Sequence, residues 1–205
     1  HVRYLDDPLI DNSFDYNDSI VAAVRGIENV ISATPHIESF TLASSGMQTK
    51  GVAVIAIDPL KEKNLSDPEN KLVKYRITEE FLEAVRADGK ISTEALEKLR
   101  KNIGRSYSST ERLELELGLS DDEKEQFLPL IMQLSAEKNG YLSADDEGVL
   151  VSDRLATFLK VGIGDSVILM GQGYHGVSAN GIFPVRGIIK MPSPDLDNKM
   201  IVMTI

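Results

Sequence analysis

The 205-residue sequence predicts an α+β fold in which a mixed or antiparallel β core subdomain, formed by both chain ends, carries an inserted, mainly helical lobe. Apolar residues alternate with a period of two in both flanks, as in strands, and recur every three to four residues in the middle, as in helices. Charge is divided in the same way, because residues 58–147 hold 35 of the 54 charged residues. We therefore expect the core subdomain at 1–60 and 148–205 and the helical lobe at 61–147.

The N-terminal flank predicts a helix followed by a β-hairpin. Asp18 is a suitable N-cap for a helix that ends near Gly26 and carries four apolar residues on one face: Ile20, Val21, Val24 and Ile27. The segments NVISATPHIESFTLASSG and KGVAVIAIDP then alternate like strands. A tight turn around Ser45, Gly46 and Met47 is expected to join them.

In the middle of the chain, residues that cap helices occur at regular intervals. The expected N-caps are Thr78, Ser92, Ser108 with Glu111, and Ser120 with Glu123. The expected helix ends are Gly89, Gly104, Gly118 and Gly140. The stretch ERLELELGL also alternates like a strand, but the capping-box spacing before it favours a helix.

The C-terminal flank predicts a short strand from Gly148, a helix capped by Ser152, and three more strands. The helix is expected to point Leu155 and either Phe158 or Leu159 inward. After it, two glycines and Asp165 suit a tight turn into the strand SVILM, and GIFPVRGIIK and KMIVMTI alternate like the remaining strands.

The stretch SVILMGQGYHGVSANG contains the spacing G-x-G-x-x-G at Gly171, Gly173 and Gly176, directly after the predicted strand. A dinucleotide site requires these glycines to open a helix inside a βαβ unit. Here Gly181 and Pro184 break any such helix, and the following residues alternate like a strand. The motif therefore indicates a glycine-rich loop between two antiparallel strands.

Composition excludes several classes of function. A net charge of −10 and a pI near 4.8 repel nucleic-acid phosphates and anionic lipids. The chain has no cysteine, which excludes disulfides and thiol catalysis, and its three histidines lack metal-ligand spacing. The acidic runs 121–123 and 145–147 lack calcium-loop spacing, and Ser178 lacks the G-x-S-x-G context of a nucleophile. We expect no catalytic residue, no metal, no cofactor and no enzymatic activity.

Three blocks together carry a family resemblance: IVAAVRGIENVISATPHI, KGVAVIAIDP, and GVLVSDRLATFLKVGIGDSVILM followed by FPVRGIIK and LDNKMIVM. In this order they resemble the extracytoplasmic core domain of MacB-type ABC-transporter permeases, the group that includes lipoprotein-releasing and FtsX-like permeases. The resemblance covers residues 17–60 and 148–205. Ala56 and Ser152 stand where glycine is common in that family.

The resemblance implies a domain in the periplasm or outside the cell, inserted between transmembrane helices of an inner-membrane permease. It implies a second permease copy or paralogue, a separate ATPase subunit or domain, and a periplasmic adaptor or carrier as partners. The domain would engage substrate or partner and relay ATP-driven motion for export or lipoprotein release. The loop residues Gly173, Tyr174 and His175 are the candidate partner-binding residues, and no nucleic acid is expected.

A second interpretation stays open. The turn KVGIGDSVIL occurs in many β folds, so the chain can also be a stand-alone soluble α+β ligand-binding module or an adaptor domain of another membrane protein. The apolar final strand, which reaches Ile205 without a cap, favours an excised domain over a stand-alone protein.

Overall fold

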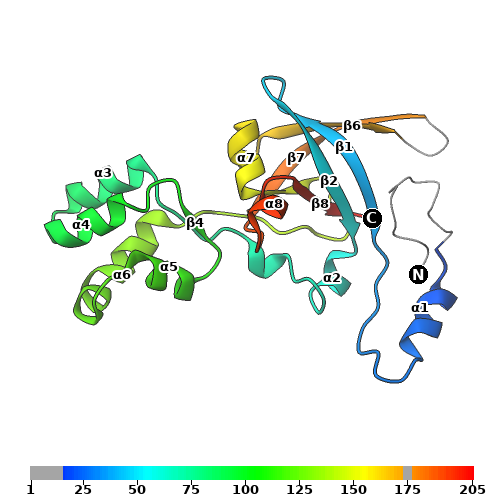
Figure 1. Cartoon of the computed structure of the whole chain (residues 1–205), viewed down its shortest axis with the longest axis horizontal. Coiled ribbons are helices and arrows are strands. Elements are labelled where there is room, and N and C mark those ends of the chain that lie inside the picture. Colours follow the sequence, from blue (N-terminus) through cyan, green and yellow to red (C-terminus); the bar gives the residue numbers. More distant parts are fainter. Residues whose placement is uncertain (1–15, 173–176) are drawn as a thin grey trace. The chain divides into compact units, whose positions relative to one another are not determined.

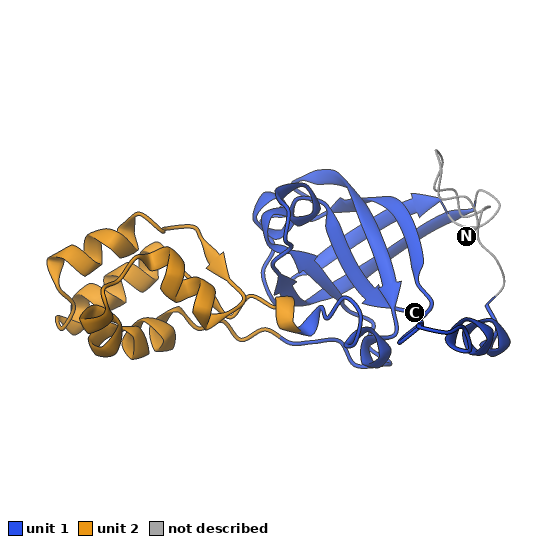
Figure 2. Ribbon diagram, turned by 60° about the horizontal axis from the view of Figure 1, so that its bottom comes forward, with its two compact units in different colours: residues 1–69, 140–205 blue, residues 70–139 orange. Residues whose placement is uncertain are grey.

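The structure is a computed structural model that describes residues 16–172 and 177–205. It confirms the α+β class, because helices and strands both make up the described chain (Figure 1). The chain divides into two compact units, one within residues 1–69 and 140–205 and the other comprising residues 70–139 (Figure 2).

The first unit is built on a closed, mixed six-stranded barrel with the strand order β1-β2-β8-β5-β7-β6. Neighbouring strands run antiparallel except for β2 with β8 and β5 with β7, which are parallel. The barrel closes through the pairing of β6 with β1, which involves residues 42–44 of β1. The strands are β1 (Ile37–Ser44), β2 (Thr49–Ile57), β5 (Val149–Ser152), β6 (Ser166–Gln172), β7 (Ser178–Ile189) and β8 (Met200–Thr204).

Alternation along the strands fills the barrel with branched apolar side chains. Cross-strand partners such as Ala43 and Leu169, or Val54 and Ile201, lie on the same face and are buried. The strand β5 is buried at all four positions, because its other face is covered as well. The expected hairpin between β1 and β2 is confirmed.

Short helices flank the barrel: α1 (Asp18–Arg25), α2 (Pro59–Glu62), α7 (Asp153–Leu159) and α8 (Pro194–Asp197). The predicted cap of α1 is wrong by one residue. Asn17 is the N-cap, because its backbone is extended and its side chain accepts a hydrogen bond from the Ile20 amide at 3.1 Å. Asp18 instead lies in the first turn, where a carboxylate is favourable.

Ser152 occupies the N-cap position of α7 but does not cap it. Its hydroxyl accepts a hydrogen bond from the Met200 amide at 3.2 Å, so it joins β5 to β8 instead. The tertiary contact replaces the local one that the sequence predicts. Leu155 and Leu159 are fully buried, whereas Phe158 is 40% exposed. The turn into β6 is as predicted, with the Asp165 carboxylate accepting from the Gly162 amide at 2.8 Å.

The second unit is mainly helical and has its own apolar core. A 3-10 turn, η2 (Glu69–Lys71), leads into it, and a two-stranded antiparallel ribbon joins β3 (Tyr75–Arg76) to β4 (Ser106–Tyr107). The core is formed by helices whose inward residues include Phe81, Val85, Leu99, Leu113 and Ile131. These helices are α3 (Glu79–Asp88), α4 (Thr93–Arg100), α5 (Thr110–Leu117) and α6 (Asp121–Ser135).

Most predicted caps of this unit are confirmed, namely Thr78, Ser92 and the Ser120–Glu123 capping box, with Gly89 and Gly118 as left-handed helix ends. The N-cap of α5 is Ser109 rather than Ser108, because the Ser109 side chain accepts from the Arg112 amide. Gly104 and Gly140 do not end helices, since the C-cap of α4 is Lys101 and that of α6 is Ala136.

Residues 61–69 and 140–147 belong to the barrel unit by contact. Glu62 pairs with His36, the Tyr141 hydroxyl donates to the Pro59 carbonyl at 3.2 Å, and the Gly140 amide donates to the Arg186 carbonyl at 3.0 Å. These contacts hold the two segments that connect to the helical unit against the barrel.

Candidate functional site

The predicted partner-binding residues Gly173, Tyr174 and His175 lie outside the described residues. The hairpin that carries them is described up to Gln172 and from Val177 onward. Its strands β6 and β7 pair antiparallel from Ser166 with Pro184 to Gln172 with Ser178. The glycine motif is therefore followed by a strand, which confirms that it does not open a dinucleotide-binding helix.

The outer face of β1, β6 and β7 carries a continuous apolar surface. Leu42 lies opposite Met170, and Ile168 lies opposite Ile182, so these cross-strand pairs share one side of the sheet. Phe40 lies on the same side as Leu42, two residues away along β1. We call these five residues the apolar face.

Three side chains of the apolar face are largely exposed to solvent. Phe40 is 59% exposed, Leu42 49% and Ile182 70%, whereas Ala43, the inward residue that follows Leu42 along β1, is fully buried. Contiguous exposed apolar side chains mark interaction sites in soluble domains. These side chains are therefore a candidate contact surface for a partner.

The close approach of β1 and β6 depends on Gly171. A Cβ atom at this position would lie 2.8 Å from Thr41 Oγ1 and 3.2 Å from Thr41 Cβ. The first glycine of the motif therefore has a packing role, because it lets β6 lie against β1 behind the apolar face. The sequence motif includes this glycine, but only the pairing of β1 with β6 explains why a side chain cannot be accommodated there.

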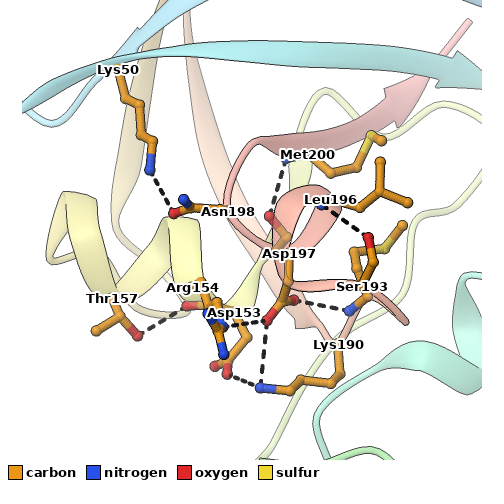
Figure 3. A network of polar contacts seen from close by, with 12 residues as sticks. Lys50, Asp153, Arg154, Thr157, Lys190, Ser193, Leu196, Asp197, Asn198 and Met200 are labelled. Atoms are coloured by element: carbon orange, nitrogen blue, oxygen red, sulfur yellow. Dashed lines mark hydrogen bonds and ion pairs between the residues drawn. The ribbon is translucent and has the colours of Figure 1, made fainter.

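An ion network with two buried carboxylates lies at the helices α7 and α8 of the barrel unit (Figure 3). Lys190 Nζ lies 2.8 Å from Asp153 Oδ2 and 3.4 Å from Asp197 Oδ2, and both carboxylates are almost completely buried. The other oxygen of Asp197 accepts from the Met191 amide at 2.9 Å, and Arg154 Nε lies 3.8 Å from Asp197 Oδ2. We call this group the Lys190 network.

The Lys190 network joins α7, the end of β7 and α8. Its carboxylates are occupied by cations and by a backbone donor, which is the arrangement that makes buried charge tolerable. Beside it, Lys50 Nζ lies 2.5 Å from Asn198 Oδ1 and 4.5 Å from the centre of the Phe158 ring. These contacts give the network a structural role. Sequence reasoning missed it, because its members are far apart along the chain.

A second buried carboxylate lies where the chain enters β1. Glu62 is fully buried, its Oε2 is 2.6 Å from His36 Nε2, and its Oε1 has no hydrogen-bond partner among the described residues. Burial, together with the charges of Glu69 and Glu62, raises the pKa of nearby Tyr141 to about 12. The pair ties the segment before β1 to α2.

Within the described ranges, no group of three or more histidine or acidic side chains is placed to hold a metal ion. None of the helices in that part of the chain has both the length and the hydrophobicity that a bilayer crossing requires.

The chain is thus an α+β protein with a closed, mixed six-stranded barrel and a solvent-exposed apolar surface. No protein-family model matches the chain. No curated protein matches it either. The function is therefore inferred from the barrel, the apolar face and the sequence blocks that build them.

Proposed function

We propose that this chain is the extracytoplasmic domain of a MacB-type ABC-transporter permease, which engages a substrate or periplasmic partner and relays ATP-driven motion for export or lipoprotein release. The observation that carries the proposal is that the second and third blocks of the resemblance build one barrel, which the first block enters at Ile37. The second block forms β2, and the third supplies β5, α7 and β6, with β7 and β8 behind them.

In this proposal both chain ends form the core subdomain, and the helical unit is an insertion in it. Support comes from the strand pairing, because β2 of the first half lies beside β8 of the second, and β1 lies beside β6. The helical unit has a separate apolar core, as an inserted lobe requires.

The apolar face and the adjoining β6–β7 hairpin are the proposed contact surface for the substrate or partner. Phe40 supplies an aromatic anchor, and the exposed Leu42 and Ile182 extend it, so the contacting surface of the partner is expected to be apolar. Gly173, Tyr174 and His175 stay the candidate contact residues at the hairpin tip. ATP binding and hydrolysis are assigned to a separate cytoplasmic domain or subunit, and the membrane anchor to helices that flank this domain in an inner-membrane permease.

The alternative is a stand-alone ligand-binding module or an adaptor domain of another membrane protein. It would use the same apolar face, because an exposed apolar surface serves any protein partner. The two interpretations differ in what surrounds the domain in its gene.

The first test is to sequence the parent gene on both sides of this segment. The permease proposal expects one apolar segment of about 20 residues before residue 1, three after residue 205, and an ATPase in the same chain or operon. Stop codons close to both ends, without such segments, would overturn it and favour the stand-alone module. Apolar segments without an ATPase would favour the adaptor domain.

The second test asks whether the apolar face is the contact surface. In the full-length permease, Ile182→Asp is expected to reduce export about tenfold or more, because it places a charge within an apolar contact. Ile163→Asp is the matched control, since Ile163 is 42% exposed and lies in the turn before β6, outside the apolar face. Equal export by both variants at equal expression would remove the face from the proposal.

A further inference from the structure

The helix α1 presents an apolar side that is not packed against a core. Ile20, Val21, Val24 and Ile27 follow helical spacing, yet the helix buries none of its residues, and Val24 and Ile27 are 37% and 59% exposed. A helix of eight residues is too short to be stable in water on its propensity alone. Such a helix needs an apolar surface to pack on.

The apolar face of the barrel has the size and chemistry of that surface. Eight helical residues extend about 12 Å, and three adjacent strands span about 10 Å between the outer two. The apolar face contains no charged residue and is uncovered in the described part of the chain. The described part of the chain thus holds two exposed apolar surfaces of similar dimensions.

The connection between them allows α1 to reach the face of its own barrel. Arg25 Nη2 donates to the Ala33 carbonyl at 2.9 Å, which joins the helix to the segment after it. His36 is held by Glu62, so the chain would have to turn in the segment between α1 and His36. The four steps along the chain from Ala33 to Ile37 reach at most about 13 Å, and Phe40 lies about 10 Å along β1 from Ile37.

Charge defines the orientation of the docked helix. Arg25 lies in the last turn of α1, and Glu38 lies on the outer side of β1, two residues before Phe40. Glu38 is exposed and forms no ion pair with another described residue. Folding back brings the C-terminal end of α1 to the start of β1, and the guanidinium retains donors for a carboxylate while it holds Ala33.

We propose that α1 docks onto the apolar face of its own barrel, with Arg25 against Glu38, and leaves it when a partner binds there. The occupant is the helix of the same chain, because a short tether gives it an effective concentration of about millimolar, far above that of a second copy in dilute solution. The docked helix would shield the exposed apolar face of its own chain from solvent. It does not depend on the permease assignment.

The test uses the absence of cysteine from the chain. Val21→Cys with Leu42→Cys places thiols on the apolar side of α1 and on the apolar face, and a short bis-maleimide joins them when they meet. The control is Ala22→Cys with Leu42→Cys, because Ala22 lies on the opposite side of the same helix. The expected result is an intramolecular cross-link at least about fivefold faster for Val21→Cys than for Ala22→Cys at micromolar protein. Peptide mass spectrometry and non-reducing electrophoresis identify it.

Equal rates for the two pairs would overturn the docking, and a product that runs as a cross-linked dimer would assign the face to a second copy instead.

A charge exchange tests the orientation without altering apolar residues. Glu38→Lys in the Val21→Cys, Leu42→Cys background is expected to slow cross-linking about threefold or more, and Arg25→Glu added to it to restore the rate. A slow rate in the double exchange would refute the Arg25–Glu38 pairing. Circular dichroism of each variant shows whether the barrel is intact before the rates are compared. Sequencing of the gene flanks, which tests the permease assignment, has no bearing on these outcomes.

Discussion

The sharpest stability prediction concerns Gly148, immediately before β5. A Cβ atom at Gly148 would lie 2.5 Å from Arg186 Cγ and 2.8 Å from the carbonyl oxygen of Pro184. The arginine side chain can move, but the carbonyl belongs to the backbone of β7. Gly148→Ala therefore forces β5 away from β7, the strand with which it pairs in parallel.

The magnitude follows from these contacts. Overpacking of this kind costs about 1–3 kcal/mol. Displacing Arg186 also disturbs its ion pair with Asp146, at 2.8 Å, and the same carboxylate accepts from the Gly148 amide at 2.7 Å. We expect a loss of about 2–3 kcal/mol in the free energy of unfolding, which lowers Tm by about 5–10 °C for a chain of this size.

Gly51→Ala on β2 is the matched control. Nothing lies within 4 Å of a Cβ at Gly51, and its φ is not in the left-handed region. Both substitutions remove the same backbone freedom from the unfolded chain, so their difference reports on the folded state alone. Thermal unfolding followed by circular dichroism, with hydrogen exchange to assign the loss to the barrel, compares the two. Equal Tm values for the two variants would refute the steric argument.

Three further predictions test the electrostatics. Lys190→Met leaves two buried carboxylates without their ammonium and is expected to cost about 2–3 kcal/mol in urea unfolding at pH 7; unchanged stability would mean that the Lys190 network does not brace the barrel. A hydrogen bond from Lys98 lowers the pKa of Glu123 below its ordinary value of 4.5, so this contribution is present above pH 4.5 and lost as pH falls below it. Lys98→Met should therefore flatten the acid branch of the stability profile, and an unaltered branch would contradict the pairing. Burial raises the pKa of Tyr141 to about 12 from 10.0, so its contribution is complete below pH 10 and lost as pH rises toward 12. Absorbance titration of the six tyrosines should lose its last step in Tyr141→Phe, and persistence of that step would assign it elsewhere.

The local elements were predictable because their causes lie within a few residues of the chain. Capping side chains at Thr78, Ser92 and Ser120 accept hydrogen bonds from amides three residues on, so their spacing is visible in the sequence. The glycine-rich hairpin was predictable for the same reason. The displaced caps at Asn17 and Ser109 show the limit of this reasoning, because adjacent polar residues are equally suited to cap until the backbone selects one.

The candidate site was only partly predictable. The sequence pointed to the hairpin tip between β6 and β7, whose residues the structure does not describe, and the apolar face beside it was not predicted. In the sequence, Phe40 and Ile182 do not differ from other strand residues. Alternation shows that the two sides of a strand differ, but it does not show which side will be covered. An unusually apolar outer side in β1, β6 and β7 was the available signal.

By itself, the sequence determined the α+β class, the hairpins, most helix caps and the absence of a dinucleotide-binding helix, since each arises from local hydrogen bonding and side-chain periodicity. Only the tertiary structure decided that β1 meets β6 to close the barrel, that Ser152 serves Met200 rather than its own helix, and that Lys190 lies between two buried carboxylates. These features join segments distant along the chain, and their energies depend on burial, which exists only once the barrel has closed and excluded water.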